Sequence, residues 1–437
     1  MCGSNIKLCL KIVHLVFQRL ILKNSWLTKG LLMKSTVRFQ LSAMMFLNFF
    51  VWGIWFVTMG TYLTKGTIGA TGGQTGLAYG TQCLGAIVAP FIVGMIADRF
   101  FSAQKILGVL HLAGAGLLYY IGTQSNFGSF YSLLLIYMII YMPTLALVNA
   151  IALKQISNAE KEFSGIRMWG TIGWIVAGLI IGWMAWETNP ASLNITYKVA
   201  AIISAAFGVY SFFLPSTPPP KAGQNVSVSE VLGLDALKIL KDKNYLIFFL
   251  ASILICIPLA FYYGQANQFL NEVGMQKAAA KMTMGQIAET IFLFLMPWFF
   301  KRFGIKQMLL FGMLAWIVRY LLFAYGDMGS GIWMLYAGII LHGICYDFFF
   351  VTGQIYTDQK AGPRVRSSAQ GLITLATYGV GMYIGFYVAG LYVDKNSLAT
   401  GGHNWKNIWI FPCLFAAGVS LMFLVLFKND KKKLAAV

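Results

Sequence analysis

The chain has 437 residues, of which 58% are hydrophobic and only 11% charged, and its mean hydropathy is +0.69. A soluble protein of this length carries about a quarter of its residues as charged side chains, so a soluble globular fold is excluded. The formal net charge of +19 would favour nucleic-acid binding in a soluble protein. Here the basic residues lie in short breaks between apolar runs, where they set membrane topology, and we expect no nucleic-acid partner.

Residues 1–38 form a basic N-terminal extension, in which lysines and arginines alternate with apolar residues. One interpretation is a basic amphipathic helix that lies on the membrane surface. Another is that translation starts at Met33, directly before the first apolar run. A signal peptide fits poorly, because no small-residue cleavage site follows the apolar part.

Twelve apolar runs follow, each near the ~20 residues that cross a bilayer as a helix. Transmembrane barrels would instead show short alternating segments, and that pattern is absent. The predicted spans are 39–63, 76–97, 105–123, 128–153, 166–186, 197–215, 245–269, 282–300, 306–326, 331–356, 366–392 and 406–427.

Residues 216–244 are the one long polar break, and they include a proline run and a short amphipathic helix. This linker separates a half over 39–215 from a half over 245–427, each with six spans, and a basic tail over 428–437 follows. Two six-helix halves joined by such a linker indicate the major facilitator architecture. The predicted fold class is therefore an all-α polytopic membrane protein with twelve transmembrane helices.

Basic residues concentrate in alternate loops, namely those after the second, fourth, sixth, eighth and tenth spans, and in the tail. The positive-inside rule places these loops in the cytoplasm. We therefore expect a multi-pass protein of the cell (inner) membrane with both termini cytoplasmic. The loop after the second span, GMIADRFFSAQK, is a degraded form of the Asp-Arg loop signature of major facilitators, and it predicts a conformational latch at Asp98 and Arg99.

Glu289 and Asp347 are the only acids well inside predicted spans. A carboxylate in hydrocarbon costs at least ~2.5 kcal/mol, so such a residue usually faces a cavity. A carboxyl group in a low-dielectric site can bind and release a proton near physiological pH. Both residues are therefore candidates for proton coupling, whereas Arg319, also within a span, is expected to pack internally.

Helical spacing gathers further polar and aromatic residues on shared faces. Arg167, Thr171 and Trp174 form one such row, Gln286 and Glu289 share another face, and His342 and Tyr346 share a third beside Asp347. Aromatic rings beside amides and carboxylates suit a flat ligand with polar edges, such as a nucleobase with its ribose. A sugar site has the same composition, so these residues do not distinguish a nucleoside carrier from a sugar carrier.

Long ordered segments give the chain a family resemblance. They include FVWGIWFVTMGTY, YMPTLALVNAIA, IRMWGTIGW, VLGLDALKILK, GQIAETIFLFLMPWFFKRFGIK, AWIVRYLLFAYGD, YDFFFVTG and RSSAQG. The chain resembles the bacterial nucleoside:proton symporters of the major facilitator superfamily from about residue 39 to 427. The resemblance implies proton-driven uptake of purine and pyrimidine nucleosides.

The resemblance also implies a substrate site, whose motif positions are Arg167, Thr171, Trp174, Gln286, Glu289, Tyr346 and Asp347. Two positions depart from the family pattern. A tyrosine that is usual in the tenth span is His342 here, and the polar pair of the seventh span has no clean counterpart, so Gln265 and Asn267 are taken in its place. Both departures are expected to affect substrate preference.

The predicted mechanism is alternating access, in which Asp347 or Glu289 takes a proton and a nucleoside binds between the two halves. Arg167 is the expected ion partner of Asp347 when no proton is bound. The alternative function is a proton-coupled carrier of sugars or other small metabolites on the same fold. An enzyme is not expected, since HExxH, GxSxG and nucleotide-binding loops are absent. The scattered cysteines and histidines predict no metal or cofactor, and the expected partners are nucleosides, protons and the lipid bilayer, with the chain a monomer.

Overall fold

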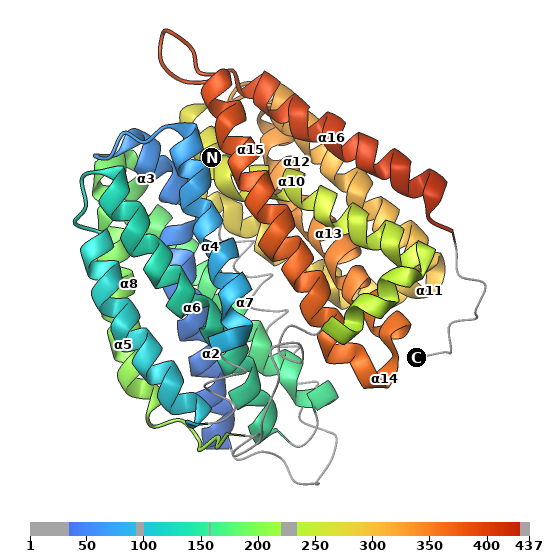
Figure 1. Ribbon diagram of the computed structural model, residues 1–437. Helices are drawn as coiled ribbons and strands as arrows, with labels where there is room; N and C mark the ends of the chain where they lie inside the picture. Colours follow the sequence, from blue (N-terminus) through green and yellow to red (C-terminus); the bar gives the residue numbers. More distant parts are fainter. Residues whose placement is uncertain (1–34, 93–99, 157–158, 220–233, 429–437) are drawn as a thin grey trace.

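A computed structural model describes residues 35–92, 100–156, 159–219 and 234–428 (Figure 1). The described chain is helical except for its connections and one isolated bridge between Ser397 and His403. Asp98 and Arg99, the predicted latch, lie outside the described residues, as do most of the N-terminal extension and nearly all of the tail.

The first half, blue to green in Figure 1, supplies six of the predicted spans. Its first span is built from two helices that meet near residue 57, and two short 3₁₀ turns, η2 (Trp186–Thr188) and η3 (Pro190–Leu193), join the last two spans. The helices are α2 (Ser35–Phe56), α3 (Met59–Lys65), α4 (Gly72–Ile92), α5 (Ala103–Ile121), α6 (Phe127–Gln155), α7 (Ala159–Trp183) and α8 (Asn194–Ser211).

The second half, yellow to red, begins with a 3₁₀ helix of the linker and contains two π-helical stretches. Its elements are η4 (Leu234–Lys241), α10 (Lys243–Glu272), α11 (Ala278–Tyr325), α12 (Ile332–Ile340), α13 (His342–Tyr346), η5 (Asp347–Val351), α14 (Thr352–Thr374), η6 (Leu375–Gly381), α15 (Met382–Lys395) and α16 (Trp405–Leu426). The amphipathic linker helix that the sequence predicts is present as η4, which packs through Ala236 on Ala369 and Leu372 of α14.

Each of the twelve predicted spans has a helix, as the fold class requires. Nine helices of the described chain are long and apolar enough to cross a membrane. One of them, α11, holds two predicted spans, because Gly304 interrupts it with a φ of 71°. Gly362 interrupts α14 in the same way with a φ of 68°. Positive φ is inexpensive only for glycine, so both interruptions fall at glycines. Helices α4 and α5 account for the two remaining predicted spans.

The two halves touch mainly along two helix pairs. Helix α4 of the first half packs against α15 of the second, and α7 packs against α11. The start of α4 meets the end of α15 at the end of the molecule that carries α3, at the top of Figure 1. At Gly76, a Cβ would lie 2.3 Å from the carbonyl oxygen of Phe386, so only glycine lets α4 approach α15 this closely.

Polar contacts join the halves at that same end, which we call the closed end and define by Lys65, Glu187, Glu272 and Asp394. The Asp394 carboxylate accepts hydrogen bonds from the backbone N–H groups of Gly72 (2.5 Å) and Gly73 (2.7 Å), the first residues of α4. The Glu187 carboxylate accepts one from the backbone N–H of Ala279 (3.0 Å), the second residue of α11. Each half therefore supplies a carboxylate that caps a helix start of the other half.

Candidate functional site

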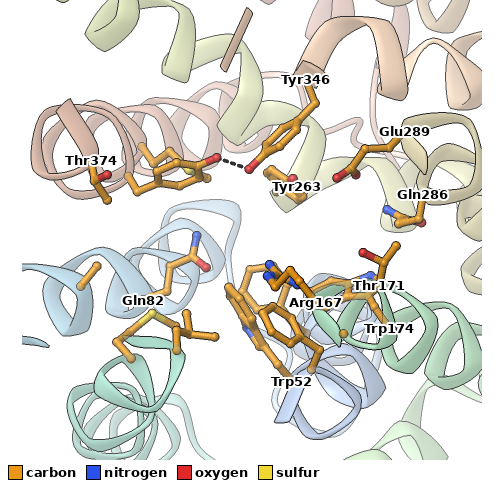
Figure 2. A pocket seen from close by; sticks show the side chains of 18 of the residues that line it. Trp52, Gln82, Arg167, Thr171, Trp174, Tyr263, Gln286, Glu289, Tyr346 and Thr374 are labelled. Atoms are coloured by element: carbon orange, nitrogen blue, oxygen red, sulfur yellow. Dashed lines mark hydrogen bonds between the residues drawn. The ribbon is translucent and has the colours of Figure 1, made fainter. Parts of the chain in front are cut away.

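A cavity of about 350 Å³ lies between the two halves, near the middle of the spans. This volume is within the range of small-molecule sites. Figure 2 shows its two walls, with Trp52, Gln82, Arg167, Thr171 and Trp174 of the first half facing residues of the second half. The hydrogen bonds found between the halves in the described chain all lie at the closed end.

Arg167 is the charged group of the first wall. Helix α7 places it one turn before Thr171 and two turns before Trp174, so the three share the face that the sequence predicts. The guanidinium carbon lies 4.2 Å from the ring centroid of Phe49 on α2, which holds the planar group by a cation–π contact. Trp174 stands edge-on to Trp52 at 5.3 Å between ring centroids, and the two rings give this wall its apolar floor.

Glu289 is the charged group of the opposite wall. It lies on α11 one turn after Gln286, and both side chains line the cavity. Glu289 makes no ion pair with any described residue, although Arg167 lines the same cavity. A carboxylate and a guanidinium thus face one space from opposite halves, and they can attract each other or bind a ligand between them.

Close packing positions the remaining wall. A Cβ at Gly343 would lie 2.6 Å from the backbone nitrogen of Glu289, so α13 rests directly on the backbone of α11. This contact brings His342 and Tyr346 of α13 to the cavity beside Glu289. The Tyr346 hydroxyl is hydrogen-bonded to that of Tyr378 on η6, which ties α13 to the neighbouring span (dashed line in Figure 2).

Asp347 lies just beyond this wall and does not line the cavity. It is fully buried at the start of the π-helical turn η5, and neither carboxylate oxygen has a hydrogen-bond partner among the described residues. The expected ion pair between Arg167 and Asp347 is not formed in this conformation. Since an ionised carboxylate without partners is costly in an apolar interior, and π-helical turns often mark functional positions, Asp347 stays a candidate for proton binding.

Gln265 and Asn267 on α10 also lie away from the cavity lining. Asn267 instead belongs to the closed end. Its amide nitrogen donates to Glu187 (2.9 Å), and its oxygen accepts a hydrogen bond from the Thr61 hydroxyl (2.7 Å). Both partners come from the first half, so the structure gives Asn267 a contact between halves. Gln265 is buried within its own half and its Oε1 has no partner among the described residues.

The sequence did not predict several other residues that line the cavity, among them Trp52, Gln82, Asn149, Tyr263 and Tyr378. Helical spacing does place Trp52 in a row with Asn48 and Trp55. The three residues of that row have different surroundings, however. Trp52 lines the cavity, Asn48 is hydrogen-bonded to His111 (2.9 Å), and Trp55 is buried. For Gln82 and Asn149 the available signal was a lone amide inside an apolar span. The other two are aromatic residues among many, and nothing local distinguishes them.

Three comparisons place this chain among known proteins. The sequence profile described as nucleoside H⁺ symporter matches residues 33–432. The Escherichia coli protein described as putative nucleoside transporter YegT is 42% identical over 418 residues, which cover 93% of this chain and 96% of that protein. The E. coli nucleoside permease NupG is 31% identical over 407 residues, covering 90% of this chain and 96% of that protein. A crystal structure of NupG superposes with a TM-score of 0.82 at 30% identity, covering 90% of this chain and all of that one.

Proposed function

We propose that this chain, which belongs to the nucleoside H⁺ symporter family, takes up nucleosides across the bacterial inner membrane by coupling them to protons. The observation that carries the proposal is the cavity between the halves, where aromatic rings, amides, Arg167 and Glu289 face one space. Rings can stack on a nucleobase, while amides and charged groups can hydrogen-bond its edge and the ribose hydroxyls.

The proposed substrate site consists of Arg167, Thr171 and Trp174 from the first half with Gln286, Glu289, His342 and Tyr346 from the second. Because residues of both halves contact one ligand, binding can link substrate occupancy to the relative position of the halves. Trp52, Gln82 and Tyr378 extend the same lining. The proposed domains are the two six-helix halves, which the linker joins.

Glu289 and Asp347 are the proposed proton carriers. Glu289 lines the cavity, so a proton on it changes the charge that Arg167 and the ligand meet. Asp347 follows Ile344 by three residues in the tenth span, and its side chain is buried. Binding of a proton would remove its uncompensated negative charge. The proton gradient then drives uptake, because the loaded carrier releases its proton into the cytoplasm, where the proton concentration is lower.

Alternating access supplies the cycle. The first described residue, Ser35, and the described basic residues Lys154, Lys306 and Lys360 lie at helix ends away from the closed end. The positive-inside rule then makes that side cytoplasmic and the closed end periplasmic. The structure then corresponds to a conformation that is shut toward the periplasm. Release of the contacts of Glu187 and Asp394 would let the two halves rotate relative to each other and expose the cavity to the periplasm.

The experiment that tests this function is uptake of a labelled nucleoside panel into proteoliposomes, with and without an imposed pH gradient. Accumulation that requires the gradient and that is competed by unlabelled nucleosides supports the proposal. Sugars serve as the competitor control. If maltose or sucrose competes and nucleosides do not, the chain is a sugar carrier and the proposed substrate is wrong.

A further inference from the structure

His342 carries two features at once, since its ring lines the cavity and is nevertheless buried and held on both sides. The ring stacks on Tyr262 at 5.0 Å between centroids, and it stands edge-on to Tyr263 at 5.9 Å. A Cβ at Gly285 of α11 would lie 3.1 Å from the His342 Cβ, so the backbone of α11 presses against the same side chain. The orientation of the imidazole is therefore fixed by packing.

Arg319 of α11 fixes the proton of that imidazole. Its Nη1 lies 3.2 Å from the His342 Nδ1. An arginine has donors and no acceptor, so Nδ1 must be the acceptor in this contact. The ring proton is then on Nε2, and the Nε2–H group has no hydrogen-bond partner among the described residues. The wall of the cavity therefore contains a donor with a fixed tautomer and an unfilled hydrogen bond.

Arg319 itself is held firmly enough to do this. It is fully buried, and its guanidinium carbon lies 3.3 Å from the ring centroid of Tyr262, the same ring on which His342 stacks. Trp316 and Phe323 flank it at 5.3 Å and 5.7 Å. Arg319 forms no ion pair in the described chain. Its polar neighbours are the imidazole, the Tyr262 hydroxyl and the Cys345 thiol. A buried cation that donates a hydrogen bond to an imidazole nitrogen points to a role for that imidazole beyond packing.

We propose that Arg319 holds His342 as a hydrogen-bond donor toward the transported nucleoside, and that this donor sets which nucleosides are accepted. The group that it recognises is an acceptor atom, such as an unprotonated ring nitrogen, a carbonyl oxygen or a hydroxyl oxygen. Arg319 is a positioning residue, since it acts through His342. The inference rests on the proposed function, and it makes His342 a selector of substrates in place of a carrier of protons.

The test is a cycle that combines variants with substrate analogues in the purified full-length protein. Binding of a parent nucleoside is compared with binding of analogues that each lack one acceptor, namely 3-deaza, 7-deaza, 2′-deoxy, 3′-deoxy and 5′-deoxy forms. We expect one analogue to bind about tenfold more weakly than the parent to the wild type, the effect of an unmade buried hydrogen bond. The same analogue and the parent should bind equally to His342→Phe, which keeps the ring stacked on Tyr262.

Two further variants separate the donor from the shape of the site. His342→Gln keeps an N–H donor and should restore part of the discrimination that His342→Phe loses. Arg319→Met releases the tautomer and should reduce the discrimination, whereas Arg319→Lys, which keeps a donor to Nδ1, should retain more of it. The readout is the ratio of affinities for parent and analogue, which a purely structural role of Arg319 would not change.

The inference fails if every analogue loses the same affinity in the wild type and in His342→Phe. It also fails if Arg319→Met folds and keeps the wild-type ratio. Should Arg319→Met not fold, the comparison of His342→Phe with His342→Gln decides the matter. A wild type that binds no nucleoside at all would instead overturn the proposed function, so the two failures are distinguishable.

Discussion

Asp394 at the end of α15 accepts a 2.5 Å hydrogen bond from the backbone N–H of Gly72 at the start of α4, and this bond joins the two halves of the molecule. Glu187 makes the counterpart contact with Ala279 at the start of α11. The two contacts are reciprocal, because in each a carboxylate of one half caps a helix of the other. A carboxylate at a helix start is stabilised by the free N–H groups and by the helix dipole.

Removing either charge should open the closed end. For Asp394→Asn and Glu187→Gln we expect a loss of about 1.5–3 kcal/mol from this contact, the range for a hydrogen bond to a charged group. The measurement is labelling of Thr61→Cys by a membrane-impermeant thiol reagent, since Thr61 lies in the same contact between halves. Labelling should be faster in both variants than in the parent.

Asp327→Asn is the matched control for these variants. Asp327 accepts hydrogen bonds from the backbone N–H groups of Gly329 and Gly331 within its own loop, so its loss affects one half alone. Labelling in this control should stay at the parent rate. If all three variants label alike, the closed end is not held by Asp394 and Glu187.

Substitution of the proposed proton carriers should uncouple transport. Glu289→Gln and Asp347→Asn keep the size of the side chain but cannot bind and release a proton. We expect accumulation driven by a pH gradient to fall at least tenfold, which corresponds to about 1.4 kcal/mol. Exchange of internal for external nucleoside should persist, because exchange needs no net proton movement. An Asp347→Asn protein that accumulates nucleoside at the wild-type rate would remove Asp347 from the coupling path.

The contact of Gly343 with α11 predicts a stability effect. In Gly343→Ala the new methyl group would lie 2.6 Å from the backbone of Ala288 and Glu289, so α13 must move. Overpacking of this kind costs about 1–3 kcal/mol, and we expect a lower Tm in detergent together with weaker nucleoside binding. Gly371→Ala is the control, since no atom lies within 4 Å of its added Cβ. Equal melting temperatures for the two variants would contradict the packing argument.

Asp242 predicts a pH dependence at the junction of the linker with α10. It caps α10 by accepting from the Tyr245 N–H (2.9 Å), and it pairs with Lys360 at 2.7 Å. Partial burial works to raise the pKa of Asp242, but the bonds from Lys360 and Tyr245 outweigh it and hold that pKa below its usual value. A lowered pKa in the folded state means that the stabilisation is present above the ordinary aspartate pKa of about 3.9 and is lost as pH falls through the folded value.

The measurement is Tm as a function of pH for the wild type and Asp242→Asn. The variant should melt lower by a constant amount between about pH 5 and 8, and the two curves should converge only in more acidic solution. A difference that changes near neutral pH would mean that another group titrates at this junction. The effect should be small, because the Asp242 side chain is 42% exposed and solvent screens the pair.

The sequence by itself determined the fold class and singled out seven residues that line the cavity. Apolar runs of bilayer length, interrupted by loops, leave few alternatives to spanning helices, because lipid offers no partner for backbone polar groups. Charged or amide residues inside such runs stand out against that background, and helical spacing orders them. Arg167, Thr171, Trp174, Gln286, Glu289, His342 and Tyr346 were found in this way, and they all line the cavity.

Only the tertiary structure decided what each polar group meets. Asn267 and Glu289 look alike in sequence, as polar residues in apolar spans, yet the first joins the two halves and the second lines the cavity. The contact between Arg319 and His342 spans two helices, and no spacing along one helix predicts it. The physical reason is that periodicity fixes the face of a helix, while the packing of helices against one another fixes which faces become cavity, which become interface and which nitrogen of an imidazole keeps its proton.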